Sequence, residues 1–219
     1  MPSSIWAVVV ARVSNGAKSR LAGALDPAER RSLVLAMLAD VVSVCTDCRD
    51  LVDGVIAVVD EPDAAARVEA AGAEAVYDTH PNDMNAAITR GMAHAAQRGA
   101  TTAIVLPGDV PLLSRSDLQA LLSAAADSPH VAVVGVSRDG QGTNALLLRP
   151  LDVIAPAFGP PSVDRHVALA QAAGARTHVL EGLDLSLDVD TPADLRALLH
   201  RRVGPNTTVF LHDLLAVSH

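Results

Sequence analysis

The chain has 219 residues, enough to bury a large core within one domain, or within one domain and a small appendage. Half of the residues are apolar but only 2% are aromatic, so the core must be built from Ala, Val, Leu and Ile. The formal net charge is -8 with no block of like charges, which argues against nucleic-acid and anionic-membrane partners because both need a concentrated basic face. A small anionic ligand needs only a few local cations and is compatible with this composition.

The sequence shows no sign of a targeting or membrane-spanning segment. The N-terminus enters a short apolar run that Arg12 stops, and no apolar run approaches the roughly 20 residues that cross a bilayer. Cys45 and Cys48 form a lone C-x-x-C inside an expected helix, where a zinc or redox role would need further partners. We therefore expect two reduced thiols and a cytoplasmic protein.

Strand-like and helix-like apolar patterns alternate along the chain. Residues 5–11 and 54–59 are continuous apolar runs, typical of central parallel strands. Between them, Asp26 suits a helix N-cap, Pro27 suits the first helical position, and Glu29 completes a capping box. Further strands are expected at 73–77, 101–106, 131–136, 145–148 and 176–180, and further helices at 63–71, 83–98, 114–126, 162–173 and 191–202.

This alternation predicts an α/β fold, with one Rossmann-like three-layer domain whose mainly parallel sheet is covered on both faces. We expect the domain to span residues 1–203 and to be followed by a C-terminal tail at 204–219, whose position nothing in the sequence fixes. Ligands of open α/β sheets bind beyond the carboxyl ends of the strands. The loops that follow the strands are therefore the segments to search for function.

The loop after the first strand is basic, with Arg12, Lys18 and Arg20 close together. Such a loop could hold a triphosphate through side-chain charges and backbone N–H groups. The fragment G-A-K-S at 16–19 resembles the end of a P-loop, but Ala17 stands where that motif requires glycine. A solvated basic loop is an equally good interpretation of this segment taken alone.

A carboxylate follows the apolar run at 101–106. In L-P-G-D-V-P-L-L, residues 106–113, Asp109 comes directly after Pro107 and Gly108. An ionised carboxylate at the rim of a core is costly unless something pairs with it. Taken alone, Asp109 is more often a turn or cap residue than a metal ligand.

A second acidic segment changes this interpretation. In L-D-L-S-L-D-V-D-T-P-A-D, residues 183–194, strand-like alternation places Asp188 and Asp190 on one face at the end of an expected strand. Two like charges so close repel each other, and Mg²⁺, which prefers oxygen ligands, removes the conflict. With Asp109 they form a plausible cluster for one or two metal ions. The alternative is a solvent-facing acidic edge.

Two loops are rich in small residues. They are G-Q-G-T-N at 140–144 and F-G-P-P-S at 158–162. Ser162 stands at an expected helix N-terminus, which is a natural seat for a phosphate or carboxylate, and Arg165 and His166 follow in the first turns. Glycine-rich turns are common in loops without function, so this signal is weak by itself.

Taken in order, short segments of the chain resemble those of a known family. They are A-K-S-R-L at 17–21, A-E-R-R at 28–31, N-A-A-I at 85–88, L-P-G-D-V-P-L-L at 106–113, G-T-N-A-L-L-L at 142–148, F-G-P-x-S-x-x-R-H at 158–166 and D-V-D-T-P-A-D-L at 188–195. The chain resembles the 2-phospho-L-lactate guanylyltransferase family, including its phosphoenolpyruvate branch, from biosynthesis of the deazaflavin coenzyme F(420). This resemblance implies a nucleotidyltransferase fold of the GT-A type, as in molybdenum-cofactor guanylyltransferases.

The resemblance also implies an activity, which is transfer of GMP from GTP to the phosphate of phosphoenolpyruvate or 2-phospho-L-lactate with release of pyrophosphate. Mg²⁺ is the implied cofactor. The implied site residues are Asp109, Asp188 and Asp190 as metal ligands, Thr143, Gly159 and Ser162 for the phosphorylated acid, and Arg12, Lys18, Arg20 and Asn85 for the nucleotide, with Lys18, Arg20 and Asp109 also catalytic. At Arg12 the family commonly carries lysine within a V-P-V-K-like run, and the two side chains differ in fork geometry.

The implied mechanism needs no side-chain base, because a phosphate dianion is already a nucleophile, so positioning and charge neutralisation would carry the catalysis. Alternatives are the same chemistry on 3-phosphoglycerate, a metal-dependent sugar-nucleotide glycosyltransferase or other nucleotidyltransferase, and a non-catalytic nucleotide-binding domain. The sequence leaves open the acceptor, the nucleotide and the oligomeric state, a homodimer being one option.

Overall fold

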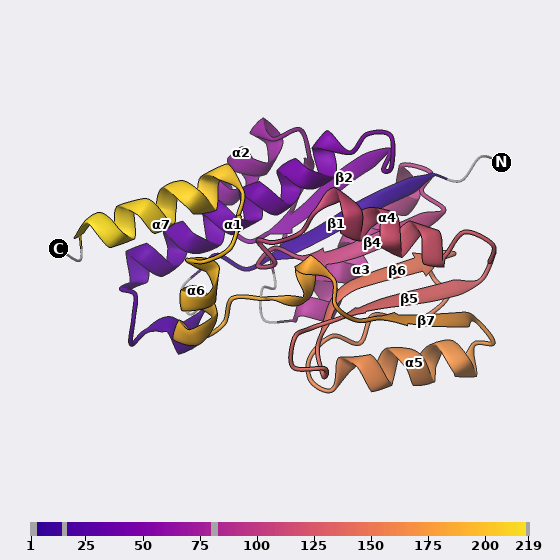
Figure 1. Cartoon of the computed structure of the whole chain (residues 1–219). Helices are drawn as coiled ribbons and strands as arrows, with labels where there is room; N and C mark the ends of the chain where they lie inside the picture. Colours follow the sequence, from indigo (N-terminus) through magenta and orange to yellow (C-terminus); the bar gives the residue numbers. More distant parts are fainter. Residues whose placement is uncertain (1–3, 15–16, 80–82, 218–219) are drawn as a thin grey trace.

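The computed structural model describes residues 4–14, 17–79 and 83–217. They contain a seven-stranded sheet in the order β3-β2-β1-β4-β6-β5-β7 (Figure 1). The strands are β1 Ile5–Ala11, β2 Gly54–Val59, β3 Glu74–Tyr77, β4 Thr102–Pro107, β5 Val131–Val136, β6 Thr143–Arg149 and β7 Arg176–Leu180. Only β6 runs antiparallel to its neighbours β4 and β5, so the prediction of a mainly parallel sheet is confirmed.

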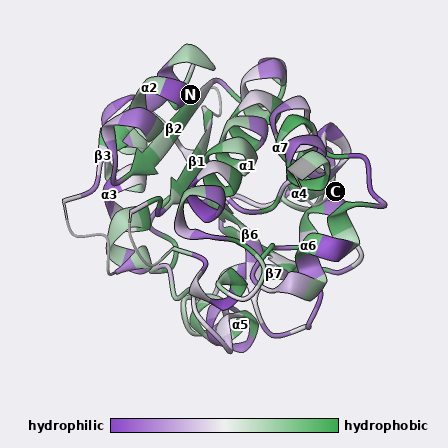
Figure 2. Ribbon diagram, turned by 90° about the vertical axis from the view of Figure 1, so that its left-hand side faces the viewer, coloured by the Kyte–Doolittle hydropathy of each residue, from purple (hydrophilic) through white to green (hydrophobic). Residues whose placement is uncertain are grey.

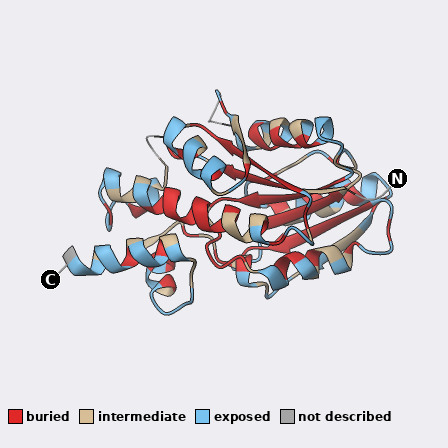
Figure 3. Cartoon of the chain, turned by 90° about the horizontal axis from the view of Figure 1, so that it is seen from above, coloured by how far each residue is buried: buried red, intermediate tan, exposed pale blue. Residues whose placement is uncertain are grey.

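Helices cover both faces of this sheet. They are α1 Pro27–Asp47, α2 Pro62–Ala70, α3 Met84–Gln97, α4 Arg115–Ala124, α5 Ser162–Ala172, α6 Pro192–Leu198 and α7 Pro205–Val217, with short 3-10 turns η1 Ser19–Leu21 and η2 Asp184–Ser186. In β1, Ala7 and Val9 belong to the core beneath α1, α2 and α4, whereas Val8 and Val10 belong to the core beneath α3 and α5. Covered faces on both sides explain why the central strands are continuous apolar runs, buried along their length in Figure 3.

Helix starts follow the capping signals in the sequence. Asp26 accepts a hydrogen bond from the Glu29 N–H and completes a capping box at α1, with Pro27 at the first helical position. Ser114 and Asp117 form the same motif at α4. Apolar residues gather on the strands and the inner helix faces, and hydrophilic ones on the outer faces and loops (Figure 2). No helix among the described residues is both long enough and apolar enough to span a membrane.

Two predicted elements near the C-terminus are wrong. The strand expected before Asp188 and Asp190 is absent from the described residues, where Asp184–Ser186 form η2 and 187–191 run extended outside the sheet. Their backbone bonds to loops instead, since the Val189 N–H donates to the Asp109 carbonyl oxygen at 3.2 Å. The helix expected at 191–202 ends at Leu198.

The cysteines confirm the simpler interpretation. Cys45 is buried in α1 and Cys48 is buried at its end, and both are free thiols. Burial, helped by the neighbouring Cys48 thiol, raises the pKa of Cys45 to about 12, so its thiol is protonated at neutral pH.

The segment after Val203 forms α7, which lies alongside α1 at one edge of the molecule (Figure 1). Its position is fixed by Asp40, a buried carboxylate in α1. Asp40 accepts hydrogen bonds from the backbone N–H groups of Asn206 at 3.0 Å and Thr207 at 2.8 Å, and from the Asn206 side chain. A carboxylate at a helix N-terminus satisfies orphan N–H groups and complements the helix dipole. Gly204 lets the backbone approach, because a Cβ there would collide with Asp40.

Replacing Asp40 should therefore release α7. We expect Asp40→Ala to lower the free energy of unfolding by about 1 to 3 kcal/mol, because buried N–H groups lose their acceptor. Hydrogen exchange of residues 205–217 should accelerate selectively. Asp47→Ala, which removes an exposed carboxylate from the same helix, is the matched control. Unchanged exchange in α7 of Asp40→Ala would contradict this assignment.

Candidate functional site

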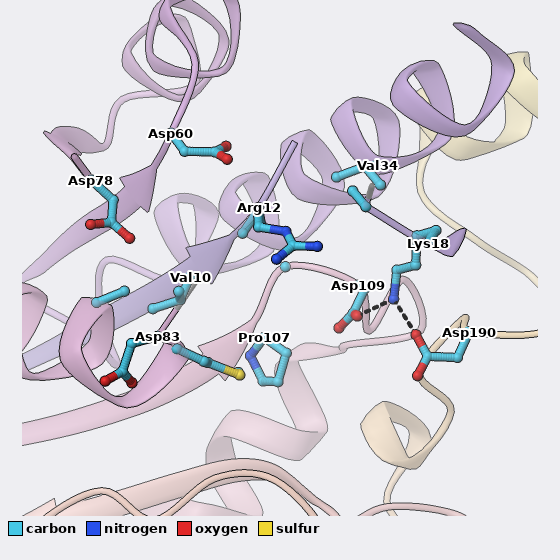
Figure 4. A pocket seen from close by; sticks show the side chains of 15 residues that line it. Val10, Arg12, Lys18, Val34, Asp60, Asp78, Asp83, Pro107, Asp109 and Asp190 are labelled. Atoms are coloured by element: carbon cyan, nitrogen blue, oxygen red, sulfur yellow. Dashed lines mark hydrogen bonds and ion pairs between the residues drawn. The ribbon is translucent and has the colours of Figure 1, made fainter. Parts of the chain in front are cut away.

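A cavity of about 290 Å³ opens at the carboxyl ends of the parallel strands. Figure 4 shows side chains from the ends of β1 and β4, from the start of α3, and from two loops around it. The lining residues are Val10, Ala11, Arg12, Ala17, Lys18, Val34, Asp60, Asp78, Asp83, Met84, Ala87, Pro107, Gly108, Asp109 and Asp190. The cavity lies where open α/β sheets bind their ligands, at the strand-end loops that carry the predicted site residues.

Pro107 and Gly108 place Asp109 at the cavity. Pro107 is the last residue of β4, and the Gly108 N–H donates to the carbonyl oxygen of Val10 at 2.9 Å. A Cβ on Gly108 would lie only 2.8 Å from the Ala11 side chain, so this close approach of two strands needs glycine. The Pro-Gly sequence therefore holds the chain tightly against β1 while the next side chain turns into the cavity.

Lys18 joins two of the predicted metal ligands. Its ammonium donates to Asp109 Oδ2 and, at 2.6 Å, to Asp190 Oδ1 (Figure 4). Burial by itself would lower the pKa of Lys18, but the charges and hydrogen bonds of Asp109 and Asp190 outweigh it and raise the pKa above that of a free lysine. Lys18 has a φ of 54°, in the left-handed region that non-glycine residues rarely adopt. The chain thus accepts local strain where it places this cation.

Asp188 lies beside this pair but bonds to another residue. Asn144 Nδ2 donates to Asp188 Oδ1 at 3.2 Å and to the carbonyl oxygens of Leu185 and Ser186. Burial raises the pKa of Asp188, and the charges of Asp109 and Asp190 raise it further. Sequence reasoning gave Asn144 no role, although it adjoins Thr143 at the start of β6. It holds the Asp188 segment against the sheet.

One carboxylate oxygen of this cluster has no hydrogen-bond partner among the described residues. This oxygen, Asp109 Oδ1, is buried. Within those same residues no three acidic, His or Cys side chains are already arranged as a metal site, and Lys18 bonds to both Asp109 and Asp190. An orphaned carboxylate oxygen beside a carboxyl of raised pKa suits a hard divalent cation. The metal site itself stays a prediction.

The other predicted cations surround the cavity more loosely. Arg12 is exposed and lines it. Arg20 is 75% exposed, with its guanidinium 3.8 Å from Asp190 Oδ2. Both guanidinium groups are therefore accessible to an anionic ligand, whereas Lys18 is held by two carboxylates. Residues 15–16 of this loop lie outside the described residues.

The opposite wall of the cavity carries two carboxylates that sequence reasoning missed. Asp60 follows β2 and accepts hydrogen bonds from the backbone N–H groups of Val13 and Ser14 at 2.8 and 3.3 Å. Asp78 follows β3 and pairs with Arg90 of α3. Each is the first acidic residue after its strand, so the rule that singled out Asp109 also applied to them. Asp60 holds the loop after β1 in place.

Asn85, predicted to lie near the nucleotide, bonds to another loop in this structure. Its Nδ2 donates to the Phe158 carbonyl oxygen at 3.2 Å, and its Oδ1 accepts from the Phe158 N–H at 2.7 Å. These two bonds fix the segment before Gly159 to the start of α3. A direct nucleotide contact by Asn85 stays a prediction.

The three residues predicted to bind the phosphorylated acid form a second group outside the lining of this cavity, as far as the described residues show. Thr143 and Ser162 are buried and hydrogen-bonded to each other at 3.0 Å. Gly159 has a φ of 100°, and its carbonyl oxygen accepts a hydrogen bond from Arg165. The N–H groups of Ser162 and Val163 both donate to the Gln141 carbonyl oxygen. These two donors at the start of α5, where the sequence suggested a seat for a phosphate or carboxylate, are therefore already used within the protein.

Strand β6 brings the carboxylate cluster around Lys18 and the group of Thr143, Gly159 and Ser162 to one edge of the sheet. Because this strand is antiparallel to β4, its first residues lie at the carboxyl end of the parallel strands. Thr143 and Asn144 are consecutive in β6 and point to opposite faces, Thr143 toward α5 and Asn144 toward η2. One strand start thus serves both groups.

This fold is similar to that of solved nucleotidyltransferases. The chain is similar to a solved nucleotidyl transferase from Methanothermobacter thermautotroptrophicus, with a TM-score of 0.65, 22% identity, and coverage of 96% of this chain and 99% of that one. At this identity the likeness shows the fold. Residues 6–218 match the family described as guanylyl transferase CofC like, and the chain belongs to that family.

Curated relatives cover nearly the whole chain. A phosphoenolpyruvate guanylyltransferase from Conexibacter woesei is 40% identical over 220 residues, 98% of each chain. A 3-phospho-D-glycerate guanylyltransferase from Phenylobacterium zucineum is 35% identical over 210 residues, 95% of each chain. The resemblance inferred from short ordered motifs is confirmed, and the protein is a guanylyltransferase by family.

His166, behind Thr143, gives a pH-dependent prediction. Burial, with a smaller effect of the Arg165 charge, lowers the pKa of His166 from 6.5 to about 4. The unfolded chain therefore takes up this proton first as the pH falls. The contribution of neutral His166 to the free energy of unfolding is fully present above pH 6.5 and is lost as the pH falls toward 4. This contribution amounts to about 3 kcal/mol.

We expect His166→Asn to flatten the decline of the free energy of unfolding between pH 7 and pH 4, measured by urea denaturation. His200→Asn, which replaces an exposed histidine, serves as the control and should keep the wild-type slope. A wild-type slope in His166→Asn would contradict the neutral, singly protonated state of this buried ring.

Proposed function

We propose that this protein transfers GMP from GTP to the phosphate of a small phosphorylated carboxylic acid, with phosphoenolpyruvate as the first candidate acceptor. An acceptor phosphate oxygen forms a bond to the α-phosphorus, the bond from that phosphorus to the oxygen bridging to the β-phosphate breaks, and pyrophosphate leaves. The observation that carries the proposal is the Lys18 ammonium among carboxylates at a strand-edge cavity. That the transferred group is guanylyl and that the acceptor is a phosphorylated acid is inferred from the names of the relatives.

The reaction joins two anions, so charge neutralisation is the main task of the site. Mg²⁺ would be held by Asp109, Asp188 and Asp190 and would supply charge compensation between the reacting phosphates. The orphaned Asp109 Oδ1 and the raised pKa of Asp188 support this assignment. Lys18 would then exchange carboxylate oxygens for phosphate oxygens of the nucleotide, joined by Arg12 and Arg20, whose guanidinium groups are accessible.

The acceptor would bind at the group formed by Thr143, Gly159 and Ser162. Phosphoenolpyruvate, 2-phospho-L-lactate and 3-phosphoglycerate all carry a carboxylate near a phosphate, and hydroxyl donors suit either group. The phosphate dianion is itself the nucleophile, so the chain needs to orient it and exclude water rather than deprotonate it. The product would be a diphosphate-linked GMP adduct of the acid, and membership of this family assigns the reaction to coenzyme F(420) biosynthesis.

The direct test is pyrophosphate release with GTP and each of the three acids in turn. We expect release that depends on both Mg²⁺ and one of the acids, and a product whose mass equals the acid plus GMP minus water. ATP and CTP in place of GTP measure the nucleotide preference. Absence of release with every acid, from folded protein, would overturn the proposed function.

The carboxylate cluster has its own test. Asp188→Asn and Asp190→Asn should each lower turnover by about two orders of magnitude or more, because charge stabilisation is lost where the phosphates react. Asp188→Asn should not destabilise the fold by loss of charge, since removing one of several like charges relieves repulsion. Asp184→Asn, an exposed carboxylate paired with Arg201, is the matched control. Wild-type turnover in both variants would leave the cluster with a purely structural role.

A further inference from the structure

A buried histidine stands behind the acceptor group without an assigned role. His166 lies in α5 and is fully buried. Its Nδ1 is 3.1 Å from Thr143 Oγ1, and its Nε2 is 2.9 Å from the backbone nitrogen of Ala157. The sequence placed it next to Ser162 but gave it no task.

The hydrogen bonds determine where the protons are. The Ala157 N–H can only donate, so His166 Nε2 must accept and carries no hydrogen. Since the ring is neutral, its one hydrogen is on Nδ1 and is donated to Thr143 Oγ1. Ser162 Oγ also donates to Thr143 Oγ1, at 3.0 Å.

Thr143 therefore accepts twice, which uses both lone pairs of its hydroxyl oxygen. Its own hydrogen is left to donate away from His166 and Ser162. A buried hydroxyl polarised by two donors is a stronger donor itself, because hydrogen bonds in a chain reinforce one another. A hydroxyl donor arranged in this way suits an anionic ligand oxygen.

We propose that His166 is a positioning residue that fixes the Thr143 hydroxyl as a donor to the carboxylate or phosphate oxygen of the acceptor. The inference rests on the proposed function, since Thr143 acts only if a phosphorylated acid binds beside it. His166 does not touch the acceptor. It acts through Thr143.

The surroundings hold the imidazole in this orientation. The Phe158 ring meets His166 edge to face, with centroids 5.1 Å apart and planes at 72°. Phe158 is in turn fixed by the two hydrogen bonds to Asn85. The Ala157 N–H locks the far side of the ring. The loop at 157–159 therefore sets both the ring and the Gly159 backbone, so acceptor contacts from two elements move together.

The proton placement is measurable without activity. In ¹⁵N-histidine-labelled protein at pH 7, the His166 ring, assigned by its loss in His166→Asn, should show hydrogen on Nδ1 and an unprotonated Nε2. The opposite tautomer would overturn the inference, because Nδ1 could then not donate to Thr143.

Kinetics separate positioning from packing. His166→Leu should raise the KM for phosphoenolpyruvate about tenfold and leave the KM for GTP within twofold, and Thr143→Val should raise the acceptor KM at least as much. Because His166 acts through Thr143, the double variant should be no worse than Thr143→Val alone. His166→Asn, whose amide can both donate and accept, should recover most of the acceptor affinity.

Additive losses in the double variant, or an equal rise in the KM values for both substrates, would assign His166 to packing alone. Thermal unfolding of each variant shows that the protein compared is folded, and His200→Asn, at an exposed histidine, should keep both wild-type KM values. If wild-type protein uses no phosphorylated acid at all, the proposed function fails, while the tautomer measurement still decides the proton placement.

Discussion

The carboxyl edge of this sheet depends on charge compensation around one ammonium group. Three carboxylates from two distant segments meet there, and Lys18 contributes the compensating charge to Asp109 and Asp190. Charges taken partly out of water are costly to desolvate, and removing one partner of such a group leaves the others uncompensated. The fold accepts this cost, and a positive φ at Lys18, at the position where an anionic ligand would meet a cation.

The arrangement of strands explains how two binding groups share one edge. Parallel strands β1 and β4 deliver the basic loop and Asp109, and the reversed strand β6 delivers Thr143 and Asn144 from its start. Asn144 reaches the carboxylates on one face, and Thr143 meets Ser162 and His166 on the other. The start of one strand therefore places residues of both predicted sites, for the metal and for the acceptor, at the same edge of the sheet.

Much of the fold and part of the candidate site could be predicted from the sequence. Continuous apolar runs marked β1 and β2, a capping box marked α1, and the strand-end rule pointed to Lys18 and Asp109. The alternation around Asp188 was real, with Leu187 and Val189 buried, but it belongs to an extended segment bonded to the Asp109 loop rather than to a strand. Period two reports which side chains face the core, not what the backbone pairs with.

Long-range polar contacts were beyond sequence reasoning. The docking of α7 depends on Asp40, 166 positions before its partner Asn206, and no local pattern links the two. The pairing of Asn85 with Phe158 and of Thr143 with His166 joins different elements in the same way. Such contacts follow from the topology, which single-sequence patterns specify only in outline.

Under the proposed function, the carboxylates around Lys18 exchange this ammonium for a divalent cation when nucleotide binds. This exchange can be observed directly. A crystal structure with Mn²⁺ and a non-hydrolysable GTP analogue should show an anomalous peak bonded to oxygens of Asp109, Asp188 and Asp190, with the Lys18 ammonium on a phosphate oxygen. A bound analogue with Lys18 still bridging Asp109 and Asp190, and no metal between the carboxylates, would contradict the account.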